Sequence, residues 1–428
     1  MVGIWILSAI IFVLIIGTLR RFIKTKDPKV ILVFLVVNFD IIICWFEFIF
    51  LRYKFLSFKL ISGKKLKEIN SKNLSIYHIY TKFLSKDNKD FLEFLSKNNF
   101  HIIISSSLPL SSDSIDYLKN SNINYSLFYK YNVGRDIHSY KFFYKKIQKL
   151  HIGYENLLFC NDSLFFIKEL SDSLDKKVND FFNDPQKTVA ALTINYVAHA
   201  HLGSFFVMAK NDRAINKRLN KYFRWYVPLS SRVWSIKYGE CGLSDALRYP
   251  HQYHVSIFYT NSNFLKIDNL EKISFATFLL NLINTQNYGS NPNANKDNII
   301  PAINKNLSII QSSISNPENN NKKYVSTYDE KIIRGNYVDT LGQSVLEMFN
   351  PTHALALNHI LAGFPFLKKD ILKVYSNFST THIVTVLKLC NINDKSVQYY
   401  IDGLISKNYK LSYGYKSFVY KIKNEVFL

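Results

Sequence analysis

Apolar and polar residues follow two different periodicities along the chain from residue 70 onward. Short runs rich in β-branched and aromatic residues predict strands, and segments with apolar residues at helical spacing lie between them. The expected strands are Ser75–Tyr80, His101–Ser106, Tyr125–Tyr131, Asn156–Cys160, Thr188–Ile194 and Ser204–Met208. The expected helices are Lys89–Lys97, Ser112–Lys119, Arg135–Leu150 and Glu240–Arg248. Repeated strand–helix units of this length predict an α/β fold with a mostly parallel sheet covered by helices.

The first apolar segment predicts a membrane anchor. Met1–Leu19 carries no charged side chain, and about 20 apolar residues span a bilayer as a helix. The segment lacks the positive start and small-residue cleavage site of a secretory signal peptide. Basic residues follow it, at Arg20, Arg21, Lys24, Lys26 and Lys29. Because basic loops stay in the cytoplasm, the rest of the chain is expected on the cytoplasmic side.

A second apolar segment, Val30–Leu51, is less suited to crossing a membrane. Asn38, Asp40 and Glu47 interrupt it, and acidic side chains are costly in hydrocarbon. Basic residues lie on both sides of it, which opposes a second crossing. We expect an interfacial or core helix here, and an ordinary buried element of the globular fold stays an alternative.

The patterns divide the chain into four regions. Residues 1–51 are expected to be membrane-associated, and residues 70–286 to form the α/β domain. Residues 287–325 are rich in Asn, Ser and Lys and predict a linker or long loop. Residues 326–428 return to amphipathic patterning and predict a largely helical C-terminal region. Within it, Phe364–Lys369 mixes apolar and basic residues, which fits either contact with a lipid diphosphate or the solvated end of a helix.

The composition gives the chain a strong positive charge, and the sequence contains no metal-binding cluster of cysteines. The chain has 54 Lys and Arg against 32 Asp and Glu, a net charge of +22, which favours anionic partners such as nucleic acid, lipid headgroups or phosphorylated small molecules. The lysines are dispersed and no nucleic-acid-binding motif is found, which argues against nucleic acid. The four cysteines are scattered, so neither a disulfide framework nor a structural zinc site is indicated.

Polar clusters follow two of the expected strands. The third strand ends in Asn132-Val133-Gly134-Arg135-Asp136, and the fourth ends in Asn161-Asp162-Ser163. In open α/β sheets, ligands bind at the carboxyl ends of the strands. Gly134 would let backbone amides approach a phosphate at a helix N-terminus, and Arg135 would add a bidentate donor. Asp162 is placed to meet a divalent cation or a sugar hydroxyl, and a carboxylate suits Mg²⁺ or Mn²⁺ bridging a diphosphate.

These clusters also have simpler interpretations. The first could be a plain strand-to-helix turn with Arg135 and Asp136 as a solvated ion pair, and the second could cap a helix N-terminus. However, Asn132 and Asp162 lie 30 residues apart, which is one helix and one strand. That arrangement is similar to the nucleotide-sugar half of GT-A glycosyltransferases.

Five sequence blocks in order carry a more specific resemblance. They are NVGRDIHSYKF from Asn132, LLFCNDSLFF from Leu157, HLGSFFVMAK from His201, YGECGLSDAL from Tyr238 and NPTHALALNHILAGFPFLKKDIL from Asn350. Together they resemble the rhamnan synthesis protein F family of bacterial polysaccharide glycosyltransferases, over roughly residues 74–372. The resemblance implies a donor site formed by Asn132, Gly134, Arg135, Asp136, Asn161, Asp162 and Ser163. The resemblance does not extend to the segment up to residue 51. It also does not identify the donor sugar.

Carboxylates and histidines further along supply candidates for catalysis and acceptor binding. An inverting transfer needs a carboxylate base for the acceptor hydroxyl, and Glu240 is the first candidate, Asp245 the second; either could be a surface carboxylate. His199 and His201 form an H-x-H pair. They could bind a transition metal, but no Cys or Glu nearby completes a ligand set. Acceptor hydrogen bonding, or a satisfied core histidine, is therefore expected.

The leading hypothesis is a glycosyltransferase at the cytoplasmic face of the bacterial inner membrane. It would move a sugar, with rhamnose as one choice, from a nucleotide-diphosphate donor to a lipid-linked cell-surface polysaccharide such as O-antigen or capsule. Mg²⁺ or Mn²⁺ would be its cofactor, and the membrane surface, not nucleic acid, its partner. The alternative is a basic, non-catalytic, membrane-associated protein that binds polyanions or glycans. An extracytoplasmic enzyme behind an uncleaved anchor is a third possibility, which the basic flanks of Val30–Leu51 oppose.

Overall fold

The computed structural model describes the α/β domain and parts of the C-terminal region. The described residues are 28–195, 201–248, 254–260, 271–272, 274–276, 279, 352, 355–372 and 378–408. The expected anchor Met1–Leu19 and the expected linker 287–325 lie outside them.

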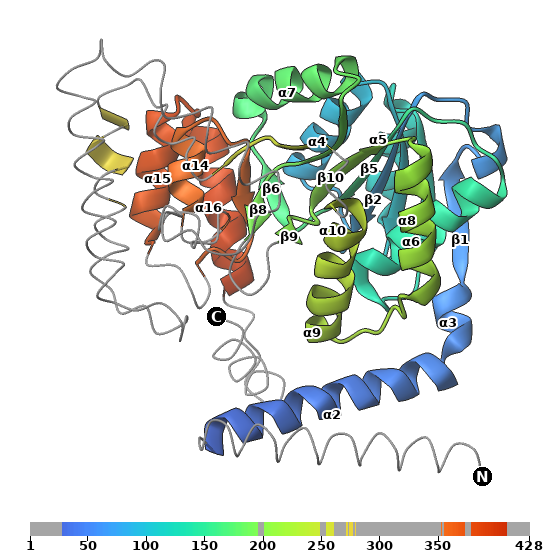
Figure 1. The fold of residues 1–428 in the computed structure, drawn as a ribbon. Coiled ribbons are helices and arrows are strands. Elements are labelled where there is room, and N and C mark those ends of the chain that lie inside the picture. Colours follow the sequence, from blue (N-terminus) through green and yellow to red (C-terminus); the bar gives the residue numbers. More distant parts are fainter. Residues whose placement is uncertain are drawn as a thin grey trace.

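The centre of the structure is an eight-stranded, mostly parallel sheet with the strand order β1-β4-β3-β2-β5-β10-β7-β11 (Figure 1). The strands are β1 (Phe58–Gly63), β2 (Asn73–Ile79), β3 (Phe100–Ser106), β4 (Tyr125–Lys130), β5 (Asn156–Asn161), β7 (Lys187–Ala191), β10 (Phe206–Lys210) and β11 (His254–Ile257). The pairs β4–β3, β3–β2, β2–β5 and β7–β11 are parallel, whereas β1–β4, β5–β10 and β10–β7 are antiparallel. The predicted α/β class is therefore confirmed, and so are the six predicted strands, to within a few residues.

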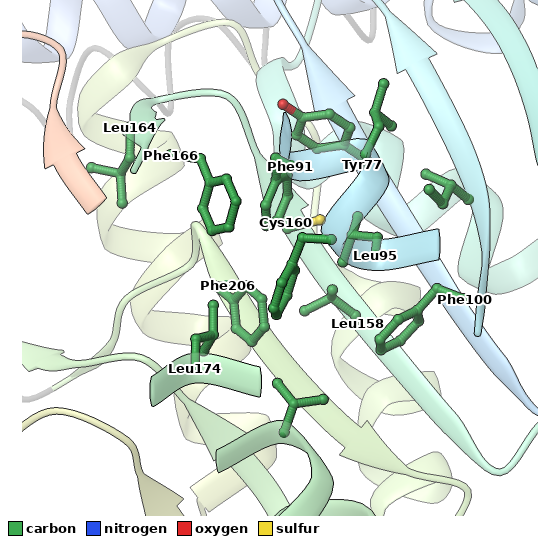
Figure 2. Packing of buried hydrophobic residues seen from close by; sticks show 14 of the residues in the cluster. Tyr77, Phe91, Leu95, Phe100, Leu158, Cys160, Leu164, Phe166, Leu174 and Phe206 are labelled. Carbon is green, nitrogen blue, oxygen red and sulfur yellow. The ribbon is translucent and has the colours of Figure 1, made fainter. Parts of the chain in front are cut away.

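Helices cover both faces of this sheet, which is why the central strands read as continuous apolar runs. One core cluster joins the sheet to α4 (Lys86–Lys97), α5 (Ser112–Asn120) and α7 (Ser171–Asn183). Figure 2 shows its aromatic centre, where Phe91 of α4 packs with Phe166 and Phe206. A second cluster on the opposite face contains side chains of α6 (Arg135–Lys149), α8 (Arg213–Trp225) and α10 (Cys241–Arg248).

The order of the strands reverses beside β2. The chain runs outward from β2 to β3 and β4, and then returns to form β5 on the other side of β2. At such a switch point the connections leave in opposite directions, and a crevice opens at the carboxyl ends of the two strands. The segments that follow β2 and β5 are therefore the first place to look for a ligand site.

The C-terminal region packs against the α/β domain through a strand and a buried ion pair. The helices described there are α14 (Ala356–Leu361), α15 (Thr380–Leu389) and α16 (Asp394–Asn408), and β12 (Phe366–Lys368) pairs antiparallel with β6 (Leu164–Phe166). Lys369 Nζ lies 3.0 Å from Asp87 Oδ2 of α4, and both side chains are buried. Phe364–Lys369 is therefore no solvated helix end, because its aromatic residues join the core and Lys369 is paired internally.

At the other end, the second apolar segment forms one helix, α2 (Pro28–Phe50), followed by α3 (Arg52–Leu56). In the part of the chain that the structure describes, no helix is both long and apolar enough to cross a membrane. One side of α2 packs on the domain and the other is exposed, so the alternative of an ordinary buried element is wrong.

Candidate functional site

The turn between β4 and α6 is held in a conformation that requires glycine. Gly134 precedes the helix with φ +64°, in the left-handed region, and a Cβ there would lie 2.6 Å from the carbonyl oxygen of Pro228. Its N–H donates to Ser230 Oγ (3.2 Å), and Arg135 Nε donates to the carbonyl oxygen of Ser230 (3.1 Å). Arg135 also has a positive φ of 53°, which is strained for a side-chain-bearing residue and is often found at binding sites.

A Gly134→Ala variant is expected to lower the free energy of unfolding by about 1–2 kcal/mol, the cost of a left-handed L-residue. The clash with Pro228 adds to this loss. Gly153→Ala is the matched control, because nothing lies within 4 Å of its added Cβ. Chemical denaturation of both variants measures the difference, and an equal effect at the two positions would contradict this account of the turn.

Lys130, which was not among the predicted site residues, stabilises the turn through its side chain. Its side chain is fully buried at the end of β4. Nζ donates to the carbonyl oxygens of Val133 (2.7 Å) and Arg135 (2.9 Å). Burial lowers its pKa to about 7, and the neighbouring Asp136 carboxylate opposes that shift. A lysine at the end of a buried strand, directly before an N-x-G turn, is the sequence signal that could have revealed it.

A short hydrogen bond joins the two predicted polar clusters. Asn161 Nδ2 donates to Asp136 Oδ2 at 2.6 Å, and Asn161 Oδ1 accepts from the Ser163 N–H (3.1 Å). Asn161 therefore links the start of α6 to the loop after β5. Asn132 is exposed at the start of the first turn. The helix-cap interpretation of Asn161-Asp162-Ser163 is wrong, because the strand β6 follows these residues.

Asp162 lies at the switch point between β2 and β5. Its N–H donates to the carbonyl oxygen of His78 (3.1 Å), and its Oδ2 accepts from the N–H of Tyr80 (3.0 Å). The side chain is half-buried. The carboxylate is thus held by the backbone that follows β2, at the edge of the sheet where a ligand is expected.

Glu240 interacts electrostatically with Asp136 of the first polar cluster. It ends a π-helical segment, Ser235–Glu240, directly before α10, and such segments are frequent at functional sites. Burial raises its pKa, and the charge of Asp136 raises it further. His201, Lys368 and a hydrogen bond with Ser204 act in the opposite direction.

The other predicted catalytic and acceptor residues lie in different environments. His201 is buried on β9 (His201–Leu202) and acts electrostatically on Glu240, whereas His199 lies outside the described residues. Asp245 is exposed on α10. Its charge helps to raise the pKa of the Cys241 thiol to about 12, after the larger effect of burial and that of Glu240.

Lys368 reaches the site from the C-terminal region, where sequence reasoning did not assign a donor-site residue. In the β12–β6 pair it lies opposite Leu164, and the N–H of Lys369 donates to the carbonyl oxygen of Ser163 (3.3 Å). Lys368 is half-buried, and its positive charge lowers the pKa of Glu240. The segment after β5 is therefore flanked by a cation that the distant β12 supplies.

The site offers few protein ligands for a metal ion. Within the described residues, no three His, Cys, Asp or Glu side chains come together as a metal-binding group. Asp162 fits the way in which Mg²⁺ is usually held in phosphate sites, by one or two carboxylates with the substrate's phosphates and water.

Comparison with known proteins does not assign the chain to a family. No family model matches it, and no curated protein matches it.

Proposed function

We propose that this chain is a glycosyltransferase with a GT-A-like domain, which transfers a sugar from a nucleotide-diphosphate donor to a growing, lipid-linked cell-surface polysaccharide. The observation that carries the proposal is the Asn161–Asp136 hydrogen bond of 2.6 Å, which unites the turn before α6 with the loop after β5. The two polar clusters meet beside the switch point of the sheet, where α/β proteins bind their ligands. The resemblance to the rhamnan synthesis protein F family makes rhamnose the first sugar to test, and O-antigen or capsule the first product.

The donor's diphosphate is proposed to bind between the two clusters. The backbone around Gly134 leads into the N-terminus of α6, which favours an anion, and Arg135 lies exposed beside it. Lys368 provides a second cation near the loop after β5. Asp162 would hold Mg²⁺ or Mn²⁺ together with the phosphate oxygens, and the ion would neutralise charge on the leaving diphosphate.

Transfer breaks the bond between the anomeric carbon and the diphosphate oxygen, and joins that carbon to the acceptor oxygen. The nucleoside diphosphate leaves with the bonding electron pair. In an inverting transfer Glu240 accepts the proton of the acceptor hydroxyl. A carboxylate whose pKa is raised by burial and by Asp136 is suited to this role, because a base works best when its pKa lies near the working pH.

We propose that the reaction takes place at the cytoplasmic face of the bacterial inner membrane. The basic residues that flank both N-terminal apolar segments support this orientation. The growing glycan on its lipid carrier would be the partner there, and the high positive charge suits phosphorylated and lipid anions.

The test is a thermal-shift screen of the full chain against nucleoside mono- and diphosphates, with and without Mn²⁺. A ligand that binds only the folded state stabilises it by about 2.7 kcal/mol at 100 times its Kd. We expect one nucleotide to raise the midpoint, and Arg135→Ala to remove the rise. Arg224→Ala, an exposed arginine at the end of α8, is the matched control. A folded protein that no nucleotide stabilises would favour the non-catalytic polyanion-binding protein instead.

A further inference from the structure

The helix α2 has one side that is fixed to the protein. Val37 and Cys44 are buried there, and Trp45 packs edge-to-face on Trp234 with ring centroids 6.1 Å apart. Asp40, which interrupts the apolar sequence, accepts a hydrogen bond from Ser231 Oγ at 2.7 Å. Asp40 therefore lies on the side of α2 that packs against the protein.

The opposite side of α2 exposes large apolar side chains in a continuous stripe. They recur every three or four residues, as expected for one face of a helix, and they are between 40% and 73% exposed. This exposed stripe consists of Leu35, Phe39, Ile43, Phe46, Ile49 and Phe50. Tyr53 and Leu56 of α3 extend it. Apolar surface gathered in this way marks an interaction site.

Basic residues lie in the sequence at both ends of the exposed stripe. Arg20, Arg21, Lys24, Lys26 and Lys29 precede it, and Arg52, Lys54 and Lys59 follow it. Met1–Leu19, earlier still, is uncharged and has the length of a bilayer-spanning segment. An apolar helix face bounded by Lys and Arg matches a membrane interface, where each basic residue near anionic lipid contributes about 1 kcal/mol.

We propose that α2 docks lengthwise on a bilayer that contains anionic lipid. The exposed stripe enters the boundary between headgroups and acyl chains, as in other in-plane amphipathic helices. Arg52, Lys54 and Lys59, which follow the stripe in the sequence, contact the lipid phosphates. An in-plane position fits this helix better than a spanning one, because Val37, Asp40 and Cys44 hold its other side against the domain.

Docking also brings the candidate donor site towards the membrane. Ser231 contacts Asp40 of α2, and its neighbour Ser230 contacts Gly134 and Arg135 of the donor turn. Two adjacent residues thus connect the lipid-facing helix to the turn. A lipid-linked acceptor would be met at short range, and this consequence, unlike the docking itself, rests on the proposed function.

The test uses full-length chain in phosphatidylcholine/phosphatidylglycerol vesicles, with an NBD fluorophore on one introduced cysteine. All four native cysteines are buried, so labelling is directed to the new position. Phe39→Cys, Phe46→Cys and Phe50→Cys sample the exposed stripe, and Asp116→Cys on α5, which is exposed, is the control. We expect lipid with a nitroxide at a shallow acyl position to quench the three stripe positions to a similar extent, and the control to keep its fluorescence.

Two other results would overturn the proposal. A quenching depth that changes steadily from residue 39 to residue 50 would mean a spanning helix. An absence of lipid quenching at all three positions would mean that protein, such as a second copy of the chain, covers the stripe. Because no sugar transfer is measured, either failure leaves the nucleotide-binding test of the proposed function untouched.

Discussion

Replacing Asp162 by Asn is expected to lower sugar transfer by at least about 100-fold, the range seen when a single charge-stabilising group is lost. Its Oδ2 accepts a hydrogen bond from the Tyr80 N–H at 3.0 Å, and the amide oxygen of Asn can accept the same bond. The substitution therefore removes the negative charge while keeping the local backbone. The rate of nucleoside diphosphate release is measured, with the donor whose nucleotide stabilises the protein in the thermal-shift screen.

The matched control for this prediction is Asp116→Asn, an exposed carboxylate on α5. Asp116→Asn is expected to unfold within about 0.5 kcal/mol of the native chain, as surface substitutions usually do, and Asp162→Asn, which can keep the bond from Tyr80, is expected to stay folded. If the Asp162 variant is folded and transfers sugar at the native rate, Asp162 is not the acid that positions the diphosphate. The same loss in both variants would point to a general effect of surface charge.

The sheet was predictable because its central strands are buried on both faces. His101–Ser106 reads as a continuous apolar and small-residue run, and the structure has β3 at Phe100–Ser106 with every residue buried. The edge strand β1 was not predicted. Its side chains alternate between half-buried and exposed, and Lys59 among them makes the segment resemble a basic loop. An edge strand leaves a weaker pattern, because only one of its faces packs.

The candidate site was predictable only where the carboxyl ends of the parallel strands supply its residues. The clusters after β4 and β5 follow from the rule that parallel strands end at the same edge of a sheet. Lys368 and Ser230 could not be found in this way, because pairing and loop packing bring them from distant parts of the chain. The sequence ranked Glu240 before Asp245 but did not show how differently the two carboxylates are buried. Five helical residues turn through about 140°, so Glu240 is half-buried near Asp136 and Asp245 is exposed.

Glu240→Gln is expected to reduce transfer by about 10²–10⁴-fold, the usual contribution of a general base, and at the same time to stabilise the fold at neutral pH. Burial and the charge of Asp136 raise the folded-state pKa above the ordinary glutamate value of 4.5. The folded chain therefore holds this proton more tightly than the unfolded chain. Stability from this group is present below about pH 4.5 and is lost as the pH rises through the folded pKa.

Since Gln resembles the protonated acid, the Glu240→Gln variant avoids this loss. Thermal unfolding of both proteins between pH 4 and pH 8 should give similar midpoints in acid and a higher midpoint for the variant at pH 8. The native enzyme's rate should rise with pH as Glu240 ionises, and the variant's residual rate should lack that rise. Asp245→Asn, on the exposed side of α10, should keep the native rate. If Asp245→Asn loses activity and Glu240→Gln keeps it, the base is Asp245. If both variants keep their activity, neither carboxylate takes the acceptor's proton, and the transfer must proceed without a base at this helix.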